Sequence, residues 1–325
     1  MARKLRLEYP GARYHIINRG NYRLDAFWAD ETKAAFEGCL FEACAKSGWI
    51  LHAFVVMRNH YHLALETPEG NLAVGMQWFQ GTFANRFNRF RDERGHLFQG
   101  RYKAILTEEG RPLGAVCDYI HLNPVRAGIV PVARLQEYRH SSYWYLHQPA
   151  KRPAFLRPQS ALAWAGGIPD TPWGRGEYSQ RLELELEQGT KRKKSANLCR
   201  GWAIGSARFK ADLIAEFGLR GTARTWDEAE AAVEIRQIRW EAALARAMEV
   251  VGYTCAEALA SKKSESWKMA VAAWMKTRTD TSNGWLSTKL ALGHPKAFSR
   301  NLTDYRRLKQ ANDPFWRILM LLPET

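Results

Sequence analysis

The sequence predicts an α+β protein in which helices pack on an antiparallel sheet and a helical region follows. Over residues 1–130, strand-like and helix-like periodicities alternate in the order β-α-β-β-α-β-α. From Thr225 onward the pattern is helical, and the stretch before it is rich in Pro, Trp and Gly. We therefore expect three regions: a domain over residues 1–130, a connecting region with a basic loop over 131–224, and a helical domain over 225–325.

The first elements are predicted from short apolar segments and the residues that bound them. Residues 12–18 are typical of a strand, closed by a turn at residues 19–21. Asp30 is expected to be the N-cap of a helix that ends at Gly48. Asn71 is expected to cap a second, longer helix, whose apolar stripe is formed by Leu72, Met76, Phe79, Phe83 and Phe90.

The hairpin between these two helices carries the first candidate for chemistry. Residues 49–56 are apolar and rich in β-formers, and residues 58–59 are typical of the turn into a second strand. In that strand His60 and His62 are two residues apart, so both imidazoles should leave on one face. Two neutral imidazoles at this spacing can form half of a divalent-metal site. The alternative is a pair of hydrogen-bonded histidines, because a His-x-His pair also arises by chance.

Two further elements complete the first region. Residues 96–106 are expected to form a strand with two basic residues, and residues 113–122 a helix. The helix should end near Asn123-Pro124, because proline disfavours the helical conformation in the residue before it. Tyr119 and Asn123 are four residues apart, so a continuous helix would place both on the same side.

Tyr119 and Asn123 offer the chemistry that the histidine pair lacks. A tyrosine hydroxyl can act as a nucleophile, and an asparagine carbonyl can be a third metal ligand. Two alternatives stay open: Asn123 is purely structural at the start of a separate short turn, or Tyr119 is an ordinary tyrosine of an amphipathic helix. Tyr61 is expected to point away from the histidines, and Tyr14 and Tyr102 to lie on strands. Tyr119 is therefore the best candidate nucleophile.

The composition points to a polyanionic partner. The chain of 325 residues has a formal net charge of +15 and a pI near 9.7, which suits nucleic acid first and an anionic membrane surface second. An aromatic content of 12% favours nucleic acid, especially single strands, because unpaired bases can stack on aromatic rings. The alternative is a basic soluble protein without such a partner.

The cysteines and the N-terminus predict a cytoplasmic protein, which we expect to be associated with the nucleoid. The five cysteines are an odd number without Cys-x-x-Cys spacing, so they fit neither a disulfide framework nor a zinc ribbon. The first residues lack the apolar segment of a secretion signal, and no apolar run approaches the length needed to span a membrane. We therefore expect no membrane partner.

Four motifs of the first region occur in the order in which a known family carries them. They are Tyr14-His15-Ile16 with Asn18-Arg19-Gly20-Asn21, Met57-Arg58-Asn59-His60-Tyr61-His62, Phe98-Gln99-Gly100-Arg101-Tyr102-Lys103, and Tyr119-Ile120-His121-Leu122-Asn123-Pro124-Val125-Arg126-Ala127-Gly128. Over roughly the first 130 residues the chain thereby resembles the REP-associated tyrosine transposases, a branch of the HUH single-tyrosine transposases.

This resemblance implies a ferredoxin-like sheet with the histidine pair on a central strand. It also implies a divalent metal, Mg²⁺ or Mn²⁺, held by His60, His62 and Asn123, and attack by Tyr119 on one phosphodiester of single-stranded DNA. The products would be a 5′-phosphotyrosine and a free 3′-hydroxyl, and the substrates palindromic repeats that fold into hairpins. The basic residues of these motifs that we expect to contact DNA are Arg19, Arg58, Arg101 and Lys103.

The rest of the chain adds candidate DNA contacts. The basic run Lys191–Lys194 is either a solvated loop or a phosphate clamp. Thr225 and Thr254 each begin a capping box that marks a helix start. A helix, a glycine-containing turn and a second helix that carries Lys296 and Arg300 are typical of a helix-turn-helix DNA reader. The alternative is a small helical bundle with a basic surface.

Together these patterns predict a metal-dependent endonuclease and strand transferase that acts on hairpin-forming single-stranded DNA through a covalent phosphotyrosine. The protein is expected to be a monomer or a homodimer. One alternative function is a domesticated relative that binds hairpin DNA or regulates genes without cutting. Another is a hydrolytic nuclease, in which the histidines hold a metal that activates water and Tyr119 is structural.

Overall fold

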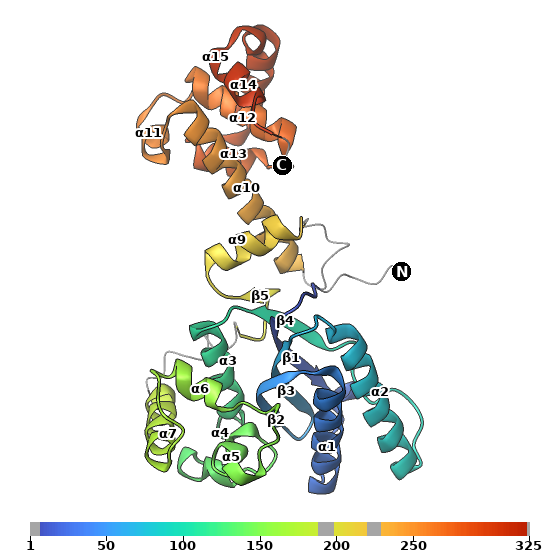
Figure 1. Cartoon of the computed structure of the whole chain (residues 1–325). Coiled ribbons are helices and arrows are strands. Elements are labelled where there is room, and N and C mark those ends of the chain that lie inside the picture. Colours follow the sequence, from blue (N-terminus) through green and yellow to red (C-terminus); the bar gives the residue numbers. More distant parts are fainter. Residues whose placement is uncertain (1–6, 188–197, 220–228, 324–325) are drawn as a thin grey trace. The chain divides into compact units, whose positions relative to one another are not determined.

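The structure, a computed structural model, describes residues 7–187, 198–219 and 229–323 (Figure 1). It divides into two compact units, residues 1–209 and residues 210–325. Each unit has a hydrophobic core of its own. In the first unit, the predicted order β-α-β-β-α-β-α is confirmed.

The first unit is built on a five-stranded sheet with the strand order β2-β3-β1-β4-β5. Neighbouring strands are antiparallel, except that β5 runs parallel to β4. The β2-β3-β1-β4 part has the ferredoxin-like order, and the predicted α+β fold with the histidine pair on an interior strand, β3, is confirmed. The strands are β1 (Ala12–Arg19), β2 (Ile50–Val56), β3 (His60–Thr67), β4 (Lys103–Thr107) and β5 (Ala203–Ile204).

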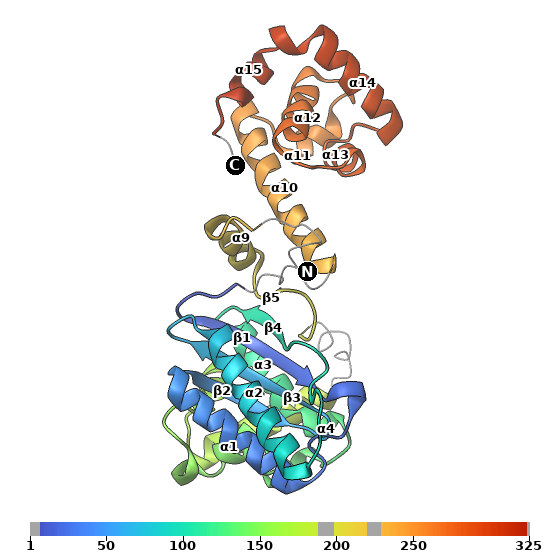
Figure 2. The same ribbon diagram turned by 90° about the vertical axis from the view of Figure 1, so that its right-hand side faces the viewer.

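Helices cover both faces of the sheet (Figures 1 and 2). α1 (Asp30–Ser47) and α2 (Leu72–Arg91) lie on one face, and α3 (Arg111–His121) lies on the other. The core under α1 and α2 is aromatic: the ring centroid of Phe36 lies 4.7 Å from that of Tyr61 and 5.0 Å from that of Phe79. Burying such large rings contributes much of the stability of a domain of this size.

The side chains of Asp30 and Asn71 do not cap their helices as predicted. Asp30 is the first residue of α1, so Ala29 rather than Asp30 is its N-cap. Asn71 is the N-cap of α2, but its side chain makes no capping bond. Its Oδ1 accepts a hydrogen bond from Trp49 Nε1 at 2.7 Å, and its Nδ2 donates to Ser47 O at 3.0 Å. Asn71 therefore joins the end of α1 to the start of α2.

Two predictions at the end of α2 and the start of β4 are wrong. Phe90 is 86% exposed rather than part of the apolar stripe, and Phe87 is buried near this end instead. A helix of 20 residues is about 30 Å long, and its last turn extends past the aromatic core. The predicted strand over residues 96–106 is shorter, because the left-handed backbone of Gly100, with φ 68°, interrupts it before Lys103.

α3 does not continue to Asn123. A second short helix, α4 (Asn123–Arg126), starts after Leu122, whose ψ of −3° departs from the helical value. The break agrees with Pro124, which has no N–H to donate to the carbonyl of Ile120 four residues earlier. The side chain of Asn123 nevertheless stays beside α3, because its Nδ2 donates a hydrogen bond to Tyr119 O at 3.3 Å.

Residues 131–187 belong to the first unit, where they pack beside α3 and the outer edge of β2. Leu51 N donates to Phe155 O at 2.9 Å, and Val56 N donates to His140 O at 3.0 Å. The elements are α5 (Ser142–Leu146), α6 (Gln159–Trp164) and α7 (Pro172–Glu187), with 3-10 turns at Val132–Glu137 and Pro149–Lys151.

The second unit is helical, as predicted. Its central helix is α12 (Ser266–Arg278), on which Trp267, Val271 and Trp274 are buried. The predicted capping box at Thr254 is confirmed. The other helices are α10 (Ala229–Val251), α11 (Cys255–Ala260), α13 (Asn283–Lys289), α14 (Pro295–Leu308) and α15 (Pro314–Met320), with a 3-10 turn at Gln310–Asn312, and α9 (Ala207–Glu216) crosses the boundary between the units.

α13 and α14 are consecutive helices joined by a short turn, as in the expected helix-turn-helix. His294 caps α14, because its Nδ1 accepts a hydrogen bond from Lys296 N at 3.3 Å. Phe298 is buried, whereas Lys296 and Arg300 are exposed. The helix thus has an apolar side toward the core of its unit and a basic side toward solvent.

Two predicted features, the basic run Lys191–Lys194 and the capping box at Thr225, lie outside the described residues. They stay predictions. Among the residues that the structure does describe, no helix combines the length and the apolar character needed to cross a lipid bilayer.

Candidate active site

The α3 face of the sheet gathers imidazoles from two neighbouring strands. In the antiparallel register of β1 and β3, Arg19 pairs with His60 and Ile17 with His62. His60 and His62 leave on the same face, as predicted, with ring centroids 5.2 Å apart. His15, two residues before Ile17, leaves on this face too, and its ring centroid lies 5.1 Å from that of His62.

A chain of hydrogen bonds fixes the tautomer of His62. His15 Nδ1 lies 2.8 Å from Leu198 O, which can only accept, so His15 Nδ1 carries the proton. Burial lowers the pKa of His15 to about 4, so the ring is neutral and its Nε2 is an acceptor. His62 Nδ1, 3.0 Å away, must then donate to His15 Nε2. His62 Nε2 is therefore left with its lone pair.

His60 reaches the same state through a different partner. Its Nδ1 donates to Asn59 Oδ1 at 2.8 Å, so His60 Nε2 also keeps its lone pair. Burial lowers the pKa of His60, although a hydrogen bond with the Asn123 side chain acts in the opposite direction. Burial, reinforced by His15 and His60, lowers the pKa of His62 well below its usual value. Both imidazoles are therefore neutral at neutral pH, which is the form that binds metal ions.

Tyr119 lies beside His62 and His15. α3 places its ring centroid 5.4 Å from that of His62 and 5.8 Å from that of His15. Asn123 lies close to both elements of the site, because its Nδ2 donates a hydrogen bond to Tyr119 O at 3.3 Å and its side chain acts on the pKa of His60. The structure thus brings Tyr119, His60, His62 and Asn123 together, although the helix between Tyr119 and Asn123 is broken.

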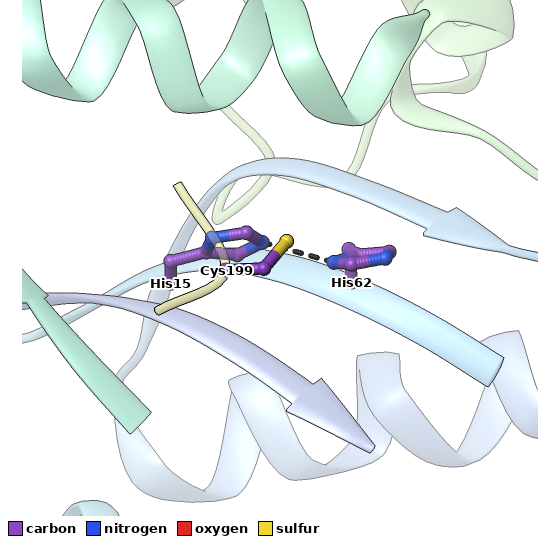
Figure 3. A group of neighbouring side chains, drawn as sticks. All are labelled: His15, His62 and Cys199. Atoms are coloured by element: carbon purple, nitrogen blue, oxygen red, sulfur yellow. Dashed lines mark hydrogen bonds between the residues drawn. The ribbon is translucent and has the colours of Figure 1, made fainter. Parts of the chain in front are cut away.

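Cys199 is a site residue that the sequence did not predict, as is His15. Figure 3 shows the segment with Cys199 passing over the sheet face beside His15 and His62. Cys199 Sγ donates a hydrogen bond to Tyr119 Oη at 3.2 Å, and Lys103 Nζ donates to Cys199 O at 2.6 Å. His15 lay within a recognised motif, whereas no motif or spacing pointed to Cys199.

The surroundings of Tyr119 hold its hydroxyl in the protonated form. Burial raises the pKa of Tyr119 well above its usual value, and the neighbouring Cys199 raises it further. The hydrogen bond with Asn123 and the charge of Arg126 act in the opposite direction. The guanidinium carbon of Arg126 lies 5.0 Å from the centroid of the Tyr119 ring. A reaction at Tyr119 must therefore remove its proton or stabilise the phenolate as it forms.

A cavity of about 820 Å³ opens beside Tyr119. The side chain of Trp164 forms part of its wall, and a Cβ on Gly114 would lie only 2.6 Å from Trp164 Cβ, so the glycine makes room for this tryptophan. Arginines and an aromatic ring in one cavity suit a nucleotide, which offers a phosphate and a flat base. The charged residues that line the cavity are Arg111, Arg126, Arg181, Asp118 and Glu185.

The four basic residues that were expected to contact DNA in this unit differ in their surroundings. Arg19 is exposed and stands in register beside His60, at the mouth of the site. Arg58, in the turn before His60, is also exposed, as is Arg101. Lys103 instead donates its ammonium to a backbone carbonyl of the chain itself.

Two sets of donors for a metal share His62. The ligand atoms of His15, His62 and Cys199 lie within 4.8 Å of one another, and the predicted set is His60, His62 and Asn123. Burial raises the pKa of Cys199, so its sulfur keeps its proton, and Mg²⁺ and Mn²⁺ prefer oxygen and nitrogen to sulfur. The contact between His15 and His62 is accounted for by a hydrogen bond. The predicted set, with two bare imidazole nitrogens and an amide oxygen, therefore fits these cations better.

Comparisons with known proteins agree with the motifs of this region. Residues 8–123 match the model of the family described as "Transposase IS200 like". A protein of Haemophilus influenzae named as a REP-associated tyrosine transposase is 25% identical over 146 residues, which cover 42% of this chain and 77% of that protein. The resemblance of the first region to this family is thereby confirmed.

Two solved structures are also similar to the chain. A REP-associated tyrosine transposase bound to a REP hairpin is 15% identical, with a TM-score of 0.39, over 47% of this chain and 89% of that one. A transposase from Deinococcus radiodurans is 21% identical, with a TM-score of 0.27, over 39% of this chain and 92% of that one. Both scores are low, so the fold rests on the strand order of this chain itself.

Proposed function

We propose that this protein, whose residues 8–123 match the model of the family described as "Transposase IS200 like", is a metal-dependent endonuclease and strand transferase for hairpin-forming single-stranded DNA. Tyr119 would attack a phosphodiester and form a covalent 5′-phosphotyrosine. The observation that carries the proposal is the position of the Tyr119 ring beside His62, 5.4 Å away between centroids. A nucleophile and two bare imidazole nitrogens there share one face of a rigid sheet.

His60, His62 and Asn123 would hold the cation, and Mg²⁺ or Mn²⁺ suits their donors. When bound, a divalent metal would withdraw charge from the oxygens of the scissile phosphate and orient it. Arg19, exposed beside His60, is placed to contact the same strand. These residues would position the phosphate so that the Tyr119 oxygen approaches in line with the bond that breaks.

The reaction exchanges one oxygen on phosphorus for another. Tyr119 Oη forms the new bond to phosphorus and loses its proton, while the bond from phosphorus to the 3′ oxygen breaks and that oxygen gains a proton. Arg126, with its guanidinium carbon 5.0 Å from the Tyr119 ring centroid, favours the phenolate electrostatically. Because the link to tyrosine retains the energy of the phosphodiester, the strand can be rejoined without a water-activating base.

Hairpin DNA is the partner that the comparisons favour. One similar solved structure is described as a transposase bound to a REP hairpin, and the net charge of +15 suits a polyanion. The cavity beside Tyr119, with its arginines and Trp164, could receive the single-stranded part next to the scissile phosphate. A homodimer or a monomer would both suit these features.

The second unit would add affinity for the DNA. α14 presents Lys296 and Arg300 to solvent at its first turns, as a recognition helix does. Lys296→Ala and Arg300→Ala should each weaken binding to a hairpin oligonucleotide. Each should lower the slope of log affinity against log salt concentration by about one, if the residue contacts a phosphate. An unchanged affinity in both variants would remove α14 from the interface.

The experiment that tests the chemistry incubates the protein with Mn²⁺ and a pool of folded single strands from the flanks of its gene. Covalent adducts are recovered by their resistance to phenol extraction and located by mass shift of the tyrosine peptide. Tyr119→Phe keeps the ring and removes the hydroxyl, so adducts and nicks should vanish together while DNA binding stays. Tyr61→Phe is the matched control, because Tyr61 lies on the other face of the sheet and should leave adduct formation intact.

Two experimental outcomes would each favour a different function. If Tyr119→Phe nicks DNA at close to the wild-type rate, the enzyme is a hydrolytic nuclease in which a metal at His60 and His62 activates water. If the wild type forms no nick or adduct with any divalent metal but binds hairpins, the protein is a binding or regulatory relative without cleavage activity.

A further inference from the structure

The segment that follows β1 makes a turn of a kind that its residues disfavour. Tyr22 has φ 50° and ψ 26°, and Arg23 has φ 60°. Leu24 N donates to Asn21 O at 2.8 Å, which closes a type I′ turn with Tyr22 and Arg23 at its centre. Such turns require positive φ at both central positions and therefore favour asparagine and glycine. A bulky aromatic residue there is strained.

The surrounding backbone holds this turn in place. Asn21 N donates to Leu97 O at 2.8 Å, and Gly20 N donates to Asn59 O at 2.8 Å. A Cβ on Gly20 would lie 2.4 Å from Leu24 O, so the chain can fold back this tightly only because residue 20 is glycine. The turn is thus fixed between the segment before β4 and the turn that precedes His60.

The strained turn places an aromatic ring in solvent. Tyr22 is 93% exposed, so the strain is not offset by burial of its side chain. A concavity of about 240 Å³ lies beside it, lined by Asn21, Tyr22, Arg94 and His96 among others. The neighbouring backbone keeps Tyr22 in a strained conformation although its side chain gains no buried contacts. Backbone strain of this kind is typical of residues that bind ligands.

The neighbouring surface has the charge that a nucleic acid strand needs. Arg23, within the turn, and Arg94, in the lining of the concavity, are both exposed. Trp28, 66% exposed, lies under the guanidinium of Arg58, whose carbon is 4.2 Å from the ring centroid. The acidic residue of the concavity, Glu93, is paired with a neighbouring arginine at 3.0 Å. A surface with both aromatic rings and arginines suits an unpaired nucleotide. Its base can stack on a ring, and its phosphate can pair with a guanidinium.

We propose that Tyr22 is a stacking platform for an unpaired nucleotide of the DNA substrate, with the concavity beside it receiving the edge of the base. This inference rests on the proposed function, because it assumes that the chain binds a strand with unpaired bases. It adds a second contact to the chemistry at Tyr119. Arg19, the residue before Gly20, stands in register beside His60, so a base held at Tyr22 would fix the strand close to the metal-binding histidines.

The test uses the full chain and two stem-loop oligonucleotides, one with an unpaired 5′ tail and one with a blunt stem. A fluorescent adenine analogue, whose emission falls on stacking, is placed at each tail position in turn. Tyr22→Ala should weaken binding of the tailed stem-loop about tenfold and abolish the fall in emission at one position. Binding of the blunt stem-loop should stay unchanged. Tyr22→Phe should behave as the wild type does.

Tyr22→Gly separates stacking from folding. Glycine relieves the strained φ, so this variant should melt at a higher temperature than the wild type yet lose the same affinity for the tail as Tyr22→Ala. Trp173→Ala is the matched control, because Trp173 is similarly exposed, at 71%, on α7, and its loss should change nothing.

The results can contradict stacking at Tyr22 without contradicting the proposed function at Tyr119. If Tyr22→Ala and Tyr22→Gly bind the tailed stem-loop as tightly as the wild type, and the wild type forms adducts through Tyr119, the platform is wrong and the proposed function stands. Equal losses on the tailed and the blunt stem-loop would also overturn the platform, because stacking acts on unpaired bases. If the wild type binds neither oligonucleotide, the proposed function fails and the platform fails with it.

Discussion

The two faces of the same sheet serve different ends. On β3, Tyr61 and Leu63 face α1 and α2, and both are fully buried. The rings of Phe36 and Phe79 pack against Tyr61. His62, which lies between Tyr61 and Leu63 in sequence, faces α3 and the candidate site. The period of a strand thus separates residues that stabilise the fold from residues that do chemistry, one position apart.

Substitutions on the two faces of the sheet should therefore have different effects. Removing atoms from the aromatic face leaves a cavity, which costs stability. The other face offers bare imidazole nitrogens and an open cavity beside Tyr119. A substitution there should change metal binding and cleavage before it changes stability.

The largest effects should come from a pair of neighbours, His62→Ala and Leu63→Ala. His62→Ala should abolish cleavage and weaken Mn²⁺ binding, measured by titration calorimetry, while the protein stays folded. Leu63→Ala should lower the free energy of unfolding by about 2–5 kcal/mol and leave Mn²⁺ affinity near that of the wild type. A His62→Ala variant that is as destabilised as Leu63→Ala, or that still cuts DNA, would contradict this difference between the two faces.

A smaller effect is expected at His15, which touches the metal site only through His62. Its Nε2 accepts from His62 Nδ1 at 3.0 Å and thereby keeps the lone pair of His62 on Nε2. Partners of this kind typically contribute about 10–100-fold to metal affinity, so His15→Ala should lose that much. His15→Gln, which can still accept a hydrogen bond, should recover part of it. Equal affinity in both variants and the wild type would show that His15 only fills space.

The smallest effect concerns a histidine of the same layer that does no chemistry. His121 is buried, with Tyr178 Oη at 2.9 Å and Ser142 Oγ at 2.8 Å from its ring nitrogens. Burial lowers its pKa to about 3, against 6.5 when unfolded. The unfolded chain therefore binds the extra proton first, so stability is present above pH 6.5 and is lost as the pH falls toward 3.

The slope from this one residue should reach at most about 1.4 kcal/mol per pH unit. Urea unfolding of the wild type and of His121→Asn across that range measures it. His121→Asn should show a flatter dependence on pH. The same slope in both proteins would assign the acid sensitivity to other groups.

Much of the fold could be predicted from local patterns. The alternation around His60 and His62 places both imidazoles on one face whatever the rest of the chain does, and Gly48 ends α1 with a left-handed backbone. Phe90 was assigned wrongly because helical spacing does not tell where the core ends. Asn71 lies at a helix start, but its partner Trp49 comes from the segment before β2, and only the tertiary structure reveals that bond.

The rest of the site could not be predicted, because it depends on contacts between distant parts of the chain. His15 meets His62 through the register of β1 with β3, across 47 residues. Cys199 reaches Tyr119 across 80 residues, on a segment with no motif of its own. Such pairs follow from strand register and from the path of a connecting segment, which a single sequence does not specify.

The outer strands of the ferredoxin-like part of the sheet, β2 and β4, both bond to backbone from outside that part. β5 runs along the end of β4, and residues 140–157 bond to β2 at Leu51 and Val56. A bare strand at the edge of a sheet is a template onto which another chain can add. Here the backbone edges of β4 and β2 are already bonded to β5 and to residues 140–157. A strand of a second copy can therefore not add to the sheet along these stretches of β2 and β4.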